Sequence, residues 1–264
     1  MTRSVQFATD IAVRYSPVTQ GVHGMASWSQ HQNQDWARSY HTAPIVMDEL
    51  YFAAASMPIV FEHVDNGARP VALIDCGEAS MILENGQWAG AYVPSVLRAH
   101  PFATTPTGEV RVDSDSEHWH LGPKGKRLYD TLGNPTEEFK QVQHFCSTLG
   151  RALARAQTLG TVLRQSDVFQ PATTLSDLNS AAAAELFVVS PEKLRGLDAA
   201  VATRLLKSDA LALAYAHLAS LPKINQLKSV QRVRHARSAA GDTPKTSGSG
   251  EVDSFLAALS AARD

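Results

Sequence analysis

Two Asn-Gly pairs, at 66–67 and 85–86, constrain the fold of this chain more than any other feature. Asn-Gly is the strongest short-range signal for a tight β-hairpin, because both residues accept the positive backbone φ angles that such turns require. The first pair separates two apolar, β-branched runs, PIVFEHV (58–64) and PVALIDC (70–76), and the second follows SMILE (80–84). The first half of the chain is therefore predicted to form an antiparallel β-meander.

Other elements are predicted around this meander. Apolar residues recur at helical spacing after Pro44, which predicts a helix over 44–55. Pro94 and Pro101 bound a single helical turn, because proline is tolerated at the start of a helix and ends one. Residues 108–115 alternate as a strand, whereas residues 1–40 are rich in Gln, Asn and Ser and are expected to form an irregular N-terminal lead-in.

The second half of the chain reads mainly as helix. A long amphipathic helix is predicted to begin near Asn134-Pro135, with Glu137 and Glu138 favourably placed at the positive end of its dipole. Its apolar face comprises Phe139, Val142, Cys146, Leu149, Leu153, Ala156 and either Val162 or Leu163. A strand at 185–190 and helices at 198–207 and 208–221 are predicted to follow.

Strands therefore cluster before helices rather than alternating with them. This order predicts one α+β domain over residues 41–237, in which the antiparallel meander packs against helices from the second half. The composition of residues 238–250 is that of a flexible linker. Residues 251–264 are predicted to form a short amphipathic docking helix, marginal alone, that binds a partner or folds back on its own domain. Its apolar stripe is Val252, Phe255, Leu256 and Leu259.

The composition excludes several classes of protein. With 264 residues, 44% of them hydrophobic, and a net charge of -2, the chain is an ordinary globular protein without a global field for nucleic acid or acidic membranes. Its two cysteines are too few for a disulfide framework. Neither a secretory signal nor an apolar run of membrane-spanning length is found, so a cytoplasmic location is expected. Export by a signal-independent route stays open as an alternative.

Several segments are similar to a known family. DELYFAAASMPIVF, PVALIDCGE, NGQWAGAYVPSVLRAHPF and RLYDTLGNPTEEF occur in a fixed order. On these segments the chain resembles the SapC family of bacterial proteins, whose name comes from an association with surface-layer genes. The resemblance extends from Pro44 to Leu221 and implies a SapC-like α+β domain over 41–237 with a surface-layer-related, structural role. It brings no catalytic residues that can be carried over.

The segment AYVPSVLRAHPF contains the candidate binding residues. Aromatic side chains beside cationic donors are typical of peptide or carboxylate recognition. The residues are Trp88, Tyr92, Arg98, His100 and Phe102. The alternative is that this segment closes the open end of the sheet, with Arg98 paired to a carboxylate such as Glu62 or Asp75.

A metal site is a second hypothesis. His118 and His120 would share one side of a strand and could bind zinc or iron together with a carboxylate from elsewhere, and His100 or His144 could serve as a further histidine ligand. The alternative is a solvated loop anchored by Trp119. Residues 222–237 carry five cations and no acid, which would permit weak nucleic-acid binding, although nucleic acid is not the expected partner.

The motifs of common enzymes are missing from the sequence. It contains no G-x-S-x-G elbow, Walker loop or G-x-G-x-x-G fingerprint, and Cys146 is expected to be a small core residue rather than a nucleophile. No cofactor is therefore expected. The function predicted is that of a non-enzymatic binding or assembly protein of the SapC type, with a protein partner or self-assembly. A metal-dependent enzyme that uses His118 and His120 is the alternative.

Overall fold

The computed structural model describes residues 14–65, 67–75, 80–172 and 185–225. Within them, helices and wholly antiparallel sheets confirm the α+β class. The expected linker at 238–250 and docking helix at 251–264 lie outside the described residues. The described residues belong to a single compact unit.

The largest sheet, called the central sheet below, has five strands in the order β10-β11-β4-β5-β3. Its middle is the predicted hairpin of β4 (Ile59–Val64) and β5 (Gly67–Leu73), in which Val64 pairs with Gly67. The remaining strands are β3 (Thr42–Pro44), β10 (Phe169–Pro171) and β11 (Leu186–Val189). All neighbours are antiparallel.

The third strand predicted for the meander, at residues 80–84, is not formed. Residues 80–84 make isolated bridges, between Asp75 and Ser80 and between Ile82 and Trp88, and a hydrogen bond from the N–H of Leu83 to the carbonyl oxygen of Gln87 closes a turn at the second Asn-Gly pair. The place beside β5 is taken by β3, where Ala43 pairs with Ala72. The predicted helix over 44–55 is accordingly shorter, because Pro44 ends β3, and it comprises the 3₁₀ turn η2 (Met47–Glu49) and α3 (Leu50–Ser56).

Residues 14–40 also differ from the expected irregular lead-in. β1 (Tyr15–Pro17) pairs with β7 (Val110–Asp113), which pairs with β6 (Phe102–Thr104) in a sheet of order β1-β7-β6, called the β7 sheet below. β2 (Ser27–Trp28) lies between β8 (Trp119–His120) and β9 (Lys126–Arg127). α2 (Gln20–His23) and the 3₁₀ turn η1 (Asp35–Ala37) complete this segment. Long-range pairing overrides the polar composition of the segment.

The remaining helices agree with the sequence pattern. α4 (Ser95–Arg98) follows Pro94 as a single turn. In the second half, Ser190 caps α7 (Pro191–Arg195) and Asp198 caps α8 (Ala199–Lys207) through hydrogen bonds from main-chain N–H groups. α9 (Ala210–Ser220) packs against α3 and the central sheet. Two groups of buried side chains result. One lies between the central sheet and its helices, and the other, called the aromatic core below, surrounds Trp28, Phe102 and Phe139.

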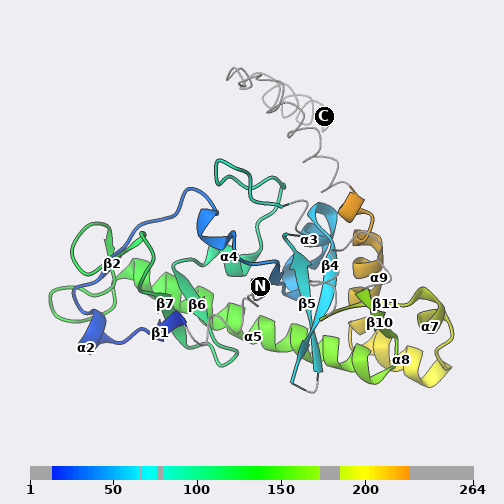
Figure 1. Cartoon of the computed structure of the whole chain (residues 1–264). Coiled ribbons are helices and arrows are strands. Elements are labelled where there is room, and N and C mark those ends of the chain that lie inside the picture. The colour runs from blue at the N-terminus through cyan, green and yellow to red at the C-terminus, as the bar shows by residue number, and fades with distance from the viewer. Residues whose placement is uncertain (1–13, 66, 76–79, 173–184, 226–264) are drawn as a thin grey trace, which may run out of the picture. The chain divides into compact units, whose positions relative to one another are not determined.

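The long helix α5 (Glu137–Gln165) confirms the main prediction for the second half. Thr136 caps it, since its Oγ1 accepts a hydrogen bond from the N–H of Phe139 at 3.2 Å. The helix contributes Phe139 and Cys146 to the aromatic core and Leu159 and Leu163 to the core of the central sheet. Figure 1 shows α5 extending past the β7 sheet and past β5.

Two glycines bring α5 close to the central sheet and to the β7 sheet. A Cβ atom added at Gly160 would overlap the carbonyl group of Ala68 in β5. One added at Gly150 would overlap the carbonyl oxygen of Thr105 and approach Gly108, in the turn between β6 and β7. Any larger residue would push the helix away from main-chain atoms, which cannot move aside as a flexible side chain can. The two glycines therefore set the spacing between the helix and each sheet.

His217 attaches α9 to the central sheet. Its Nε2 accepts a hydrogen bond from the N–H of Val189 at 3.0 Å, and its Nδ1 lies 2.7 Å from the carbonyl oxygen of Ile59. This pair of partners requires a neutral ring that is protonated at Nδ1. Burial lowers the pKa of His217 to about 4, which agrees with the neutral form.

We expect Gly150→Ala and Gly160→Ala each to destabilise the protein. Overpacking against main-chain atoms costs about 1–3 kcal/mol, although alanine alone would favour a helix by up to about 1 kcal/mol. Thermal unfolding monitored by circular dichroism should show a melting temperature lowered by several degrees. Gly21→Ala in α2 is the matched control, because nothing lies within 4 Å of its added Cβ. Equal melting temperatures for all three variants would contradict the close approach of α5.

A second prediction concerns the pH dependence of stability. His217 has a folded-state pKa of about 4, below the ordinary value of 6.5, so the unfolded chain takes up its proton first as the pH falls. The free energy of unfolding should therefore decrease between pH 6.5 and 4, with about 3 kcal/mol from this group. Denaturant titrations of the native chain and of His217→Asn, which does not titrate, should diverge over that range. Parallel pH profiles would refute the assigned neutral ring.

Candidate functional site

The segment from Trp88 to Arg98 is organised by a buried carboxylate. Glu49, at the end of η2, is only 3% exposed. Its Oε2 accepts hydrogen bonds from the Tyr92 hydroxyl at 2.7 Å and from the N–H and hydroxyl of Ser95 at 2.8 and 2.7 Å. Its Oε1 accepts the N–H of Val46 at 3.1 Å. A buried polar group is tolerated where it is hydrogen-bonded. Through these hydrogen bonds Glu49 fixes a loop more than forty residues away in the sequence.

Arg98 extends this network to the surface. Its Nη2 donates hydrogen bonds to the Tyr92 hydroxyl at 3.1 Å and to Ser95 Oγ at 2.8 Å, and its Nε donates to the carbonyl oxygen of Val93 at 3.1 Å. The guanidinium carbon also lies 5.5 Å from the centroid of the Tyr92 ring, within cation–π range. Burial and the hydrogen bond to Glu49 raise the pKa of Tyr92, so its hydroxyl stays protonated.

The expected ion pair between Arg98 and Glu62 is not formed. Glu62 in β4 pairs instead with Arg69 in β5, directly across the hairpin. His41 lies 3.2 Å from Asp75, and this contact raises the pKa of the histidine. The hairpin register explains the difference, since it gives Glu62 a cationic neighbour on the adjacent strand.

An exposed aromatic residue lies beside this network. Phe52 in α3 is 65% exposed, and its ring stacks on that of Tyr92 with centroids 5.7 Å apart and an interplanar angle of 21°. Trp88 is half-buried and donates its Nε1–H to the carbonyl oxygen of Tyr92 at 2.7 Å. We call Phe52, Trp88, Tyr92 and Arg98 the Tyr92 surface. The sequence motifs did not identify Phe52 as a binding residue. Its position outside the stripe of Leu50 and Ala53, which α3 buries, is the signal that could have indicated its exposure.

His100 and Phe102 do not belong to this surface. His100 is 4% exposed and stacks on Trp36 with ring centroids 3.9 Å apart. Its Nε2 lies 2.8 Å from the Ser116 hydroxyl, and burial is the main cause that lowers its pKa to about 3. Phe102 is 3% exposed and packs edge-to-face against Trp28 in the aromatic core. The structure therefore brings together three of the five predicted binding residues.

His118 lies near two other histidines. Its ring centroid is 6.1 Å from that of His31 and 6.3 Å from that of His100. His120 lies on β8, opposite Ser27. Among the described residues, no group of three or more His, Cys, Asp or Glu side chains is arranged to hold a metal ion. The metal hypothesis for His118 and His120 stays a prediction.

Two other sequence candidates have simpler outcomes. Cys146 is buried in the aromatic core, and burial raises its pKa to about 12, so the thiolate form is disfavoured. Most of the basic stretch 222–237 lies outside the described residues.

None of the described helices has both the length and the apolar character needed to cross a membrane.

Comparison with known proteins identifies one family. The family model SapC matches residues 18–227, which include the Tyr92 surface and nearly all of the described residues. No significant match was found among curated proteins. None was found among solved structures either.

We expect Glu49→Gln to destabilise the protein. The amide group that replaces one oxygen cannot accept a hydrogen bond, so either the N–H of Val46 or the donors of Tyr92 and Ser95 lose their acceptor. An unsatisfied buried donor costs about 1–3 kcal/mol, which denaturant unfolding can resolve. Glu117→Gln is the control, because that side chain is 82% exposed. A stability change equal to that of the control would refute the organising role of Glu49.

Proposed function

Because the chain belongs to the SapC family, we propose that it is a non-enzymatic binding or assembly protein that contacts another protein molecule through the Tyr92 surface. The observation that carries this proposal is the exposed ring of Phe52, stacked on Tyr92 beside Arg98. Aromatic residues and arginine are enriched at the centres of protein interfaces, where they contribute most of the binding energy.

The energetics of the surface support a binding role. Burying an exposed phenylalanine contributes about 1.5–3 kcal/mol, which the free protein does not gain. The Glu49 network already holds Tyr92, Ser95 and Arg98 in place, so a partner would not have to order these side chains. Preorganisation of this kind reduces the entropic cost of association.

The partner that we propose is a second copy of the chain. Association with surface-layer genes, which gives the family its name, implies a protein that assembles. The amphipathic segment 251–264, with Val252, Phe255, Leu256 and Leu259, belongs to the proposal as a further docking element. Its apolar spacing suits binding in a groove, and several weak contacts together would give a stable assembly. The cytoplasmic location expected above stays a prediction.

Sedimentation velocity of the full chain over a wide range of concentrations tests this function. We expect concentration-dependent association, weakened at least about tenfold by Phe52→Ser, which corresponds to about 1.4 kcal/mol. Leu206→Ser is a matched control, because Leu206 in α8 is also 65% exposed.

Deletion of residues 238–264 separates the two docking elements. Association that persists in the truncated chain but is lost in Phe52→Ser assigns it to the Tyr92 surface. A chain that stays monomeric at every concentration would contradict self-assembly. Equal weakening by Phe52→Ser and Leu206→Ser would refute the role of this surface.

A further inference from the structure

A pocket of about 270 Å³ lies beside α5, between its two glycine contacts. Leu153, Ala156 and Gln157 line it from the helix, and in the sequence they fall between Gly150 and Gly160. Because α5 touches both sheets through these glycines, the space between the two contacts is left open. The pocket therefore has walls from the central sheet, the β7 sheet and the helix that joins them.

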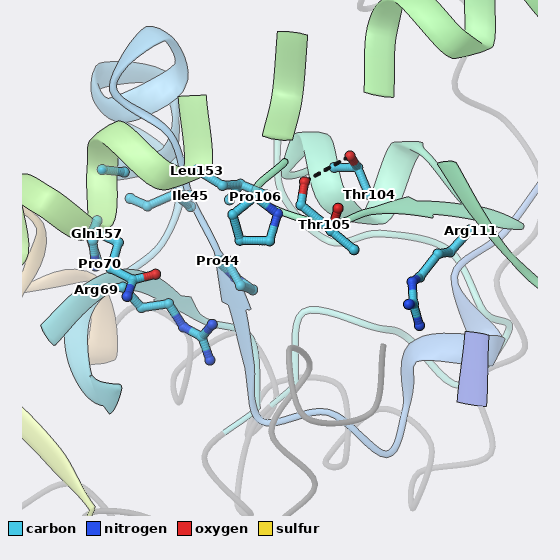
Figure 2. A pocket seen from close by; sticks show the side chains of 11 residues that line it. Pro44, Ile45, Arg69, Pro70, Thr104, Thr105, Pro106, Arg111, Leu153 and Gln157 are labelled. Carbon is cyan, nitrogen blue, oxygen red and sulfur yellow. Dashed lines mark hydrogen bonds between the residues drawn. The ribbon is translucent and has the colours of Figure 1, made fainter. Parts of the chain in front are cut away.

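Two arginines reach the pocket from different sheets. Arg69 comes from β5 of the central sheet, and Arg111 comes from β7. Figure 2 shows their side chains on opposite sides of Pro44. The two residues lie on strands of different sheets, and no local sequence pattern places them together.

Within the described part of the chain, each arginine keeps hydrogen-bond donors without a protein acceptor. Arg69 pairs with the buried carboxylate of Glu62 through its Nε, and the described residues offer no acceptor to its Nη atoms. Arg111 donates from Nε to Glu109 at 3.0 Å and from Nη1 to the carbonyl oxygen of Tyr15 at 3.2 Å. Glu109 is 47% exposed, so solvent screens this ion pair and Glu109 neutralises the charge of Arg111 only weakly.

The rest of the lining is largely apolar and stiff. Pro44, Pro70 and Pro106 contribute rings with fixed backbone φ angles, and Ile45 and Leu153 add aliphatic surface. The pocket is slightly smaller than the roughly 300–1,000 Å³ typical of ligand sites. It therefore suits a compact molecule rather than a nucleotide or a peptide.

From this combination we infer that the pocket binds a small organic carboxylate, that is, a carboxylate group attached to a compact apolar body. A guanidinium group presents its N–H donors in a fork that matches a carboxylate. Inorganic phosphate could use the same donors, but it has no apolar part to occupy the surface formed by the prolines and Leu153. The inference concerns a different surface from the Tyr92 surface and is independent of the function proposed above.

Isothermal titration calorimetry of the full chain with benzoate and hexanoate tests the inference. We expect at least one of these carboxylates to bind, and benzyl alcohol, the neutral counterpart of benzoate, to bind at least about tenfold more weakly. Inorganic phosphate should also bind more weakly than the better carboxylate. Binding of neither carboxylate, equal binding of benzyl alcohol, or equal binding of phosphate would overturn the inference.

Variants of the pocket complete the test. Arg111→Met should weaken binding of the carboxylate at least about tenfold. Arg155→Met is the matched control, because Arg155 also lies in a partly exposed ion pair, with Asp209, but does not line the pocket. Leu153→Phe, which fills the pocket without removing a charge, should block binding even if Arg111→Met fails to fold. Unchanged affinity in Leu153→Phe, or equal losses in Arg111→Met and Arg155→Met, would contradict the site.

Discussion

The close approach of α5 to main-chain atoms of two different sheets is the contact on which the rest of the structure depends. Gly160 lies against Ala68 in the central sheet, and Gly150 lies against Thr105 in the turn of the β7 sheet. One rigid helix therefore connects two groups of buried side chains that would otherwise be separate cores. The same contacts leave a pocket between them, and one arginine from each sheet lines it.

Buried polar side chains then fix the elements that surround this framework. Glu49 holds the loop that carries Tyr92 and Ser95, and His217 joins α9 to the ends of β4 and β11. Each of these groups is hydrogen-bonded at both of its polar atoms, which is the condition under which a buried polar group is tolerated. The segment AYVPSVLR, which lies within the residues matched by the SapC family model, is thus part of a surface whose side chains are held in place by hydrogen bonds.

Local signals explain which elements the sequence predicts correctly. The hairpin of β4 and β5 follows from its turn residues, and α5 follows from the acidic pair Glu137 and Glu138 in its first turn and from its regular apolar spacing. Pairing between distant segments has no such signal. Phe187 pairs with Phe61, and Trp28 pairs with Trp119, only because tertiary packing brings those strands together. For this reason the pairing of β3 with β5, and the strands β1 and β2 within residues 14–40, were not predicted.

The same distinction applies to the candidate site. Trp88, Tyr92 and Arg98 lie close in sequence and were predicted together, whereas Glu49, Phe52 and the pair of Arg69 and Arg111 come from separate elements. Glu49 could be recognised only as an acidic residue at a helix start, since its role depends on partners that the fold supplies. His100 and Phe102 share the motif, but their side chains turn into the interior instead.

Native-state hydrogen exchange of the main-chain amides tests most directly whether α5 unites the two sheets. If one helix unites them, the slowest amides of β5, β7 and the middle of α5 exchange with one common free energy, equal to that of global unfolding. If the β7 sheet and the first half of α5 open at a free energy lower by more than about 2 kcal/mol, the two sheets are separate cooperative units. That result would show that α5 does not join the two sheets into one cooperative structure.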